Sequence, residues 1–153
     1  ADGIKEGLKE NCKDNYEVIA EVDGLEAPEA QTNVESVLSA HPDANVFVGV
    51  GAGAMIGSNE ALLQKYGKGK IPENVGVITT DVTEQQLNSL KAGNEAVRSI
   101  VGFEGSNEDT AKACMEMYER ILSGEKFEGD DHNVYRTIKP ITTDNIDEIL
   151  KGM

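Results

Sequence analysis

Four apolar, β-branched blocks alternate with stretches of helical periodicity along the chain, and this alternation constrains the fold more than any other feature. The blocks recur at intervals of roughly 20–30 residues, the length of a βα unit. They are Tyr16–Val22, Asn45–Val50, Val75–Thr80 and Ala96–Val101. Between them, apolar residues recur every three or four positions, as a helix facing a core requires. Strands that alternate with helices predict a parallel sheet with right-handed crossovers.

The rest of the pattern predicts one doubly wound α/β domain over residues 1–153. The strand blocks are continuously apolar, as expected when helices cover both faces of a parallel sheet. A capping box at Thr83–Gln86 marks one helix start. Towards the end of the chain we expect a longer helix over Asn107–Gly124, a fifth extended block at Asn133–Pro140 and a short helix over Thr142–Gly152. A chain of 153 residues has room for one such domain with a substantial core.

Charge and cysteine usage exclude several classes of function. The formal net charge of −14 argues against nucleic acid as a partner and against anionic membrane surfaces, because both require clustered Lys and Arg. Cys12 and Cys114 have no metal-ligand spacing, so we expect reduced thiols, with a disulfide left open. His41 and His132 are isolated and do not have the spacing of a zinc site. The acidic surface itself is most simply a solvated one that keeps the protein soluble.

The loops that follow the predicted strands are the candidate positions for a ligand. In an open parallel sheet, ligands bind just beyond the carboxyl ends of the strands. This rule selects four loops: Asp23–Leu25, Gly51–Gly53, Asp81–Val82 and Gly102–Glu104. Asp81 directly follows a buried strand, and its carboxylate can accept two charge-assisted hydrogen bonds from neighbouring hydroxyls. The alternative is a solvated loop aspartate, or one that caps the next helix from further out.

The glycine-rich turn after the second block has two further interpretations. Gly49-x-Gly51-x-x-Ala54 fits the dinucleotide-binding fingerprint, which would make the chain a cofactor-dependent enzyme. That fingerprint needs an acidic residue about 20 positions further on, whereas Asp81 lies thirty positions after Gly51. A tight turn and close helix–sheet packing explain the glycines better. There is no nucleophile elbow or phosphate loop, so we expect neither an enzyme nor a bound cofactor.

Several longer stretches resemble a known family. They are "LSAHPDANVFVGV" (Leu38–Val50), "GSNEAL" (Gly57–Leu62), "GVITTD" (Gly76–Asp81), "SGEKFEG" (Ser123–Gly129) and "RTIKPITTDNIDEIL" (Arg136–Leu150). Together they are similar to the C-terminal half of type I periplasmic sugar-binding proteins, the solute receptors of bacterial ABC importers related to the ribose and galactose receptors. The resemblance covers essentially the whole chain.

The resemblance implies a two-lobed receptor that closes on a sugar or polyol between its lobes. This chain matches only the second lobe, and the helix Asn107–Gly124 would pack with the first. The chain would then be a fragment, or the first lobe would have been cleaved off or belong to another chain. The implied partners are the N-terminal lobe, the sugar and an ABC permease complex. The implied location is extracytoplasmic, in the periplasm or lipoprotein-anchored at the cell surface, with a leader outside this chain.

The resemblance also implies a set of ligand-binding residues. Asp81 matches the sugar-binding aspartate of the family, and Gly51-Ala52 stand where the family typically has an Asn-Asp pair. Leu25 falls where sugar receptors often place a stacking aromatic. The hinge glutamine of ribose receptors has no counterpart, and Arg98 would replace some of its hydrogen bonding, with a surface salt bridge as the alternative.

Three functions follow, in this order. The first is the extracytoplasmic solute-binding component of an ABC transporter. The second is the effector-binding domain of a sugar-responsive transcription regulator of the lactose-repressor type, whose DNA-binding headpiece would lie outside this chain. The third is the dinucleotide-dependent enzyme that rests on the Gly49 turn alone.

Overall fold

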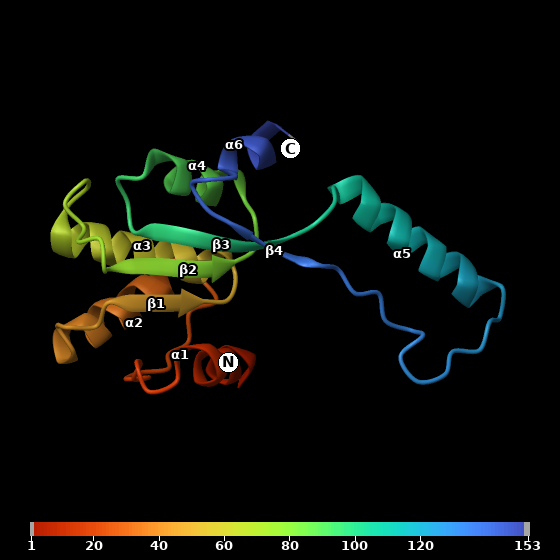
Figure 1. Cartoon of the computed structure of the whole chain (residues 1–153), viewed down its shortest axis with the longest axis horizontal. Helices are drawn as coiled ribbons and strands as arrows, with labels where there is room; N and C mark the ends of the chain where they lie inside the picture. The colour runs from red at the N-terminus through yellow and green to blue at the C-terminus, as the bar shows by residue number, and fades with distance from the viewer. Residues whose placement is uncertain (1, 152–153) are drawn as a thin grey trace.

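The computed structural model of the chain describes residues 2–151 (Figure 1). Residues 1, 152 and 153, at the ends of the predicted domain and of the last predicted helix, lie outside this range. The elements in chain order are α1 (Asp2–Cys12), α2 (Ala27–Ala40), β1 (Val46–Gly49), α3 (Ala52–Tyr66), β2 (Gly76–Thr80), α4 (Glu84–Ala92), β3 (Val97–Phe103), α5 (Asn107–Leu122), β4 (Ile138–Ile141) and α6 (Ile146–Lys151).

The strands form one sheet in the order β1-β2-β3-β4. The first three run parallel, with Phe47 opposite Val77 and Thr79 opposite Ile100. The fourth runs antiparallel, with Ile141 opposite Ile100. The chain leaves β3 at its carboxyl end, passes through α5 and re-enters the sheet from that same end, so β4 must run in the opposite direction. The predicted α/β class with a largely parallel sheet is confirmed.

One predicted strand is absent from this sheet. The block Tyr16–Val22 lies between α1 and α2 and pairs with no strand of the described chain. Its apolar side chains stay accessible, with Val18 45% and Val22 51% exposed. Here the prediction was wrong, because apolar and β-branched residues favour an extended backbone, whereas a strand also needs a neighbour in register.

The main core lies between the sheet and the helices α3 and α4. Successive side chains of a strand point to opposite faces, and Val77, Thr79 and Ile100 point to the face that these helices cover. They pack with Leu62 of α3 and Leu87 of α4, all at most 1% exposed. Each large apolar side chain buried in this way stabilises the fold by about 1.5–3 kcal/mol.

The opposite face of the sheet is covered less completely than the prediction of helices on both faces implies. Val46 and Val48 of β1 point to this face and are 54% and 42% exposed. Strands that follow one another in sheet order through right-handed crossovers place their connecting helices on one side, so α3 and α4 share a face. Both α3 and α4 have several buried residues, whereas helix α1 has none.

Helix α5 extends away from the rest of the molecule (Figure 1). None of its residues is buried, although it is clearly amphipathic. The apolar side is exposed at Met115, Tyr118, Ile121 and Leu122. Its start is fixed by a capping box in which Ser106 and Asp109 exchange hydrogen bonds. The helix was predicted from the same residue and ends two residues earlier than expected.

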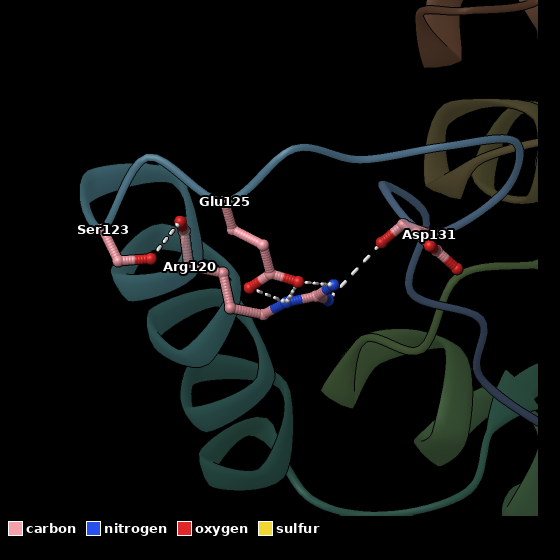
Figure 2. Close-up of polar contacts among 4 residues, drawn as sticks. All are labelled: Arg120, Ser123, Glu125 and Asp131. Carbon is pink, nitrogen blue, oxygen red and sulfur yellow. Dashed lines mark hydrogen bonds and ion pairs between the residues drawn. The ribbon is translucent and has the colours of Figure 1, made fainter.

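The loop that returns from α5 is held by an ion pair (Figure 2). Arg120 Nη2 lies 2.7 Å from Glu125 Oε1, and Arg120 Nη1 donates to the carbonyl of Asp131 at 3.4 Å. Ser123 Oγ donates to the carbonyl of Arg120 at 2.8 Å. The guanidinium holds the pKa of the Glu125 carboxyl below its ordinary value. These contacts are exposed, so they direct the path of the loop without burying much surface.

Candidate functional site at the carboxyl edge of the sheet

Three loops meet where the parallel strands end. β1 ends at Gly49, β2 at Thr80 and β3 at Phe103, and parallel strands bring these ends to one edge. Asp81 follows β2 directly and is exposed. A Cβ atom added to Gly51 would lie 3.7 Å from Asp81 Oδ2, so the carboxylate lies beside the turn that follows β1. The structure therefore brings together Asp81 and Gly51, two of the predicted site residues.

The backbone of Asp81 adopts the left-handed conformation, with φ of +67°. Aspartate tolerates this region better than most residues, yet it still costs about 1 kcal/mol or more. Such residues persist where the surrounding structure determines them, and they are concentrated at functional sites. Asp81 combines this backbone conformation with an exposed carboxylate at the end of a buried strand.

Hydrogen bonds fix the β1 turn against the end of β2. The backbone N–H of Gly51 donates to Thr80 Oγ1 at 2.9 Å, and Thr79 Oγ1 donates to the Gly51 carbonyl at 3.2 Å. Thr79 is 1% exposed, so its hydroxyl is fixed within the core. The two threonines thus determine where the Gly51 turn lies relative to Asp81.

The glycines of the turn are required by packing. Gly51 has φ of +96°, a conformation that L side chains rarely adopt. A Cβ atom on Gly53 would collide with the carbonyl of Leu25, and one on Gly57 would collide with the carbonyl of Ala27. The loop before α2 therefore approaches the first turns of α3 more closely than any side chain allows. Within the motif itself, a Cβ atom on Gly49 would lie 2.8 Å from Ala54 Cβ, so close packing of the strand end on α3 accounts for this glycine as well.

The same close approach brings Leu25 to the edge. Its side chain is 78% exposed, and its loop is held by Asn33, whose Nδ2 donates to the Asp23 carbonyl at 2.8 Å. Ala52 is the first residue of α3 and is partly exposed. The backbone of Leu25 and the start of α3 at Ala52 therefore border the Gly51 turn.

The end of β3 completes the edge. A Cβ atom on Gly102 would lie 2.9 Å from Cγ2 of Val82, so the strand lies directly against the Asp81–Val82 loop. Three of the four predicted loops thus follow strand ends along one edge. The fourth, Asp23–Leu25, reaches this edge although no strand precedes it.

Arg98 is not at this edge. It is the second residue of β3, and its Nε donates to the Val75 carbonyl at 3.1 Å while its Nη1 donates to the Glu95 carbonyl at 2.7 Å. Val75 and Glu95 precede β2 and β3, so the guanidinium lies at the amino edge of the sheet, opposite Asp81. The structure does not bring Arg98 together with the other predicted site residues.

A second polar cluster at the amino edge has no counterpart among the predictions. Glu95 accepts hydrogen bonds from Lys68 at 2.7 Å and from Asn59 at 3.0 Å, and Asn59 Oδ1 accepts from the backbone N–H of Ala96 at 2.9 Å. Lys68 is the main cause that lowers the pKa of the Glu95 carboxyl, with Ser89 and Asn59 assisting. Lys68 and Asn59 are more than 25 residues from Glu95 in sequence, so no local sequence motif predicts this cluster.

The structure also bears on metals, thiols and membrane spans. Within residues 2–151 no group of three or more His, Cys, Asp or Glu side chains has a geometry suited to a metal ion. Cys12 and Cys114 are both free. None of the helices in the described range is both long enough and apolar enough to cross a membrane.

Comparison with solved structures shows the fold. The 5-methylthioribose transporter solute-binding protein of Thermotoga lettingae matches with a TM-score of 0.77 and 18% identity, over 99% of this chain and 46% of its own. The myo-inositol-binding protein of Caulobacter matches with a TM-score of 0.74 and 20% identity, over 95% of this chain and 47% of its own. A periplasmic ribose ABC transporter protein from Conexibacter woesei matches with a TM-score of 0.73 and 19% identity, over 99% and 48%.

This chain therefore spans about half the length of these structural neighbours, which are transport binding proteins rather than enzymes. No curated protein sequence matches it. A family model described as "Periplasmic binding protein domain" matches residues 1–126, most of the chain. The chain belongs to the periplasmic binding protein family.

Proposed function

We propose that this chain is the ligand-binding C-terminal lobe of an extracytoplasmic solute receptor for a sugar or related polyol, working with an ABC importer. The observation that carries the proposal is the exposed carboxylate of Asp81, which lies beside Gly51 at the carboxyl edge of the parallel sheet. This is the edge at which open α/β sheets bind ligands. The family of the chain and the sugar receptors among its structural neighbours support the same conclusion.

The chemistry of the edge suits a polyhydroxylated ligand. An aspartate can accept hydrogen bonds from two adjacent hydroxyls at once, and the bonds are strong because the acceptor is charged. Gly51 and Ala52 have no polar side chain, so they leave space beside the carboxylate for the ligand ring. Leu25 adds an exposed apolar surface that can cover the C–H face of a sugar. Arg98 has no part in this site, since its donors are directed to backbone carbonyls at the amino edge.

The other half of the cleft would come from a first lobe. The exposed apolar side of α5 has a composition typical of a contact surface. With the loop after it, α5 borders an open hollow of about 400 Å³ lined by Tyr118, Ile121 and Val134. We infer that Asn107–Gly124 packs against that lobe. Closure of the two lobes by a hinge motion would then enclose the ligand between them.

A thermal-shift experiment on the complete natural protein tests the proposal. The ligands are ribose, glucose, galactose, arabinose and myo-inositol, with NAD as the cofactor control. At many times Kd, a ligand that binds only the folded state raises the melting temperature. We expect at least one sugar or polyol to do so and NAD to have no effect. A shift with NAD alone, or with none of these compounds, would reject the proposal.

The variant Asp81→Ala tests the residue that carries it. We expect it to abolish the sugar-induced shift. The matched control is Asp43→Ala, which removes an exposed loop aspartate that precedes β1 at the other edge of the sheet. We expect this control to keep the full shift. An undiminished shift in Asp81→Ala would remove Asp81 from the site.

A further inference from the structure

We propose that Gln86 is a positioning residue that holds Asp81 in its left-handed conformation and so directs its carboxylate toward the ligand. The expected effect of Gln86 on ligand binding rests on the proposed function, whereas its effect on the backbone of Asp81 can be tested without any ligand. Gln86 lies in the first turn of α4 and has no exposed surface. Its side-chain hydrogen bonds go to Thr83 and Thr80, on either side of Asp81, so we expect any effect on the ligand to act through the Asp81 turn.

The terminal amide of Gln86 bridges the two ends of that turn. Its Nε2 donates to the carbonyl of Thr80 at 3.2 Å, and its Oε1 accepts from the backbone N–H of Thr83 at 2.9 Å. Thr80 directly precedes Asp81, and Thr83 follows it by two residues. The two ends of the segment Thr80–Thr83 are therefore hydrogen-bonded to the oxygen and the nitrogen of one buried side-chain amide.

This arrangement replaces the usual hydrogen bond of a β-turn. In such a turn the carbonyl of the first residue accepts from the N–H of the fourth, which here would join Thr80 to Thr83. The amide of Gln86 is inserted between these two groups and satisfies both. The chain bends at Asp81, which brings the two groups to one amide. A positive φ at the first central residue is typical of sharp reversals and favours Gly, Asn or Asp.

Contacts from Thr79 and Val82 also hold the turn around Asp81. Thr79 Oγ1 lies 3.0 Å from the Thr80 carbonyl and 3.2 Å from the Gly51 carbonyl, so its single hydroxyl proton is shared between these two acceptors. Val82 packs against the core and lies beside Gly102, so the second half of the turn is held by apolar contact. The Asp81 carboxylate remains exposed on the outer side of the turn. Gln86 is thus the group that connects the position of the strand end to the start of α4.

The capping box supplies a matched control. Thr83 Oγ1 accepts from the backbone N–H of Gln86 at 3.3 Å, while the Gln86 side chain makes the reciprocal bond. Thr83→Ala removes the first bond and leaves both side-chain bonds of Gln86 in place. Gln86→Met keeps the approximate volume of the side chain and removes both of its bonds. Each variant loses part of the same cap, but only Gln86→Met loses the bond to Thr80.

Nuclear magnetic resonance of the complete protein measures the turn directly. A positive φ brings the amide and α protons of one residue close together, so Asp81 should give a strong intraresidue NOE. We expect this NOE in the wild type and in Thr83→Ala, and we expect it to weaken in Gln86→Met. An equally strong NOE in Gln86→Met would overturn the inference. If Gln86→Met does not fold, Gln86→Glu, which keeps the acceptor toward Thr83 and loses the donor toward Thr80, is judged by the same criterion.

Affinity for the sugar that gives the largest thermal shift provides the second measurement. We expect Gln86→Met to raise Kd by about tenfold and Thr83→Ala by less than about twofold. Equal effects of the two variants on Kd would mean that Gln86 acts only through the stability of α4, and would overturn the positioning role. If the wild type binds no sugar, the proposed function fails while the NOE comparison still decides whether Gln86 holds the turn.

Discussion

The two edges of the sheet differ in what their charged side chains contact. At the amino edge, Arg98 donates to the carbonyls of Val75 and Glu95, and Asn59 accepts from the backbone of Ala96. At the carboxyl edge, the carboxylate of Asp81 is exposed beside the Gly51 turn. Polar groups whose bonds go to the backbone hold the fold together, whereas an exposed acceptor at a strand end is available to a ligand. The carboxyl edge also has side chains that bond to the backbone, at Thr79, Thr80 and Gln86. We therefore propose that the amino edge serves stability alone, whereas the carboxyl edge in addition presents Asp81 to a ligand.

The largest effect on stability is expected where α2 packs against α3. A methyl group on Gly57 would collide with the Ala27 carbonyl and lie 2.6 Å from Ala30 Cβ. We expect Gly57→Ala to lower the free energy of unfolding by about 3 kcal/mol. The control is Gly7→Ala in α1, where nothing lies within 4 Å, and which should be neutral or stabilising by up to about 1 kcal/mol. Urea unfolding measures both, and similar losses would contradict the packing role of the glycines.

Arg98 provides the sharpest test of the division between the edges. Arg98→Ala leaves the carbonyls of Val75 and Glu95 without their charged donor, and we expect a loss of about 2 kcal/mol in the free energy of unfolding. The Kd for the sugar should stay within about twofold of the wild-type value. Asp81→Ala should show the reverse, with binding lost and stability changed by less than about 0.5 kcal/mol. A large loss of affinity for the sugar in Arg98→Ala would contradict the claim that Arg98 contributes to stability and not to binding.

A smaller effect is expected from pH at the amino edge. Lys68 lowers the pKa of Glu95 below its ordinary value of 4.5. A carboxyl whose pKa is lower in the folded state stabilises the protein above its unfolded pKa, and this contribution is lost as pH falls through the folded pKa. Lys68 is largely exposed, so we expect less than about 1 kcal/mol. Melting temperatures of the wild type and Glu95→Gln should differ near neutral pH and converge in acid; a constant difference would contradict this role.

Local sequence patterns predicted most of the fold, and non-local pairing accounts for the main error. The blocks that became β1, β2 and β3 each have a partner in register, whereas Tyr16–Val22, which is also rich in β-branched and apolar residues, has none in the described chain. The direction of β4 also depends on the path of α5 away from the sheet. Composition and periodicity report the backbone preference of a segment but not which edge of a sheet it meets.

The candidate site, too, was predictable where it depends on local sequence and not where it depends on the fold. The rule that ligands bind at strand ends selected Asp81, and the structure places it beside Gly51 as expected. Arg98 was selected through the family resemblance, as a replacement for the hinge glutamine. It is the second residue of β3, so it lies at the opposite edge of the sheet from the end of that strand. The capping box at Gln86 was visible in sequence, whereas its bond to Thr80 depends on the turn between them. The ligand-binding role of these residues stays a prediction.

Chemical-shift mapping by NMR tests the central claim most directly. The complete protein, labelled with ¹⁵N, is titrated with the sugar that gives the largest thermal shift. We predict that, within this lobe, the largest amide shifts occur at Gly51, Asp81 and Gly102, and that amides near Arg98 and Glu95 change little. Shifts concentrated at the amino edge, with Asp81 and Gly51 unmoved, would contradict the assignment of binding to the carboxyl edge.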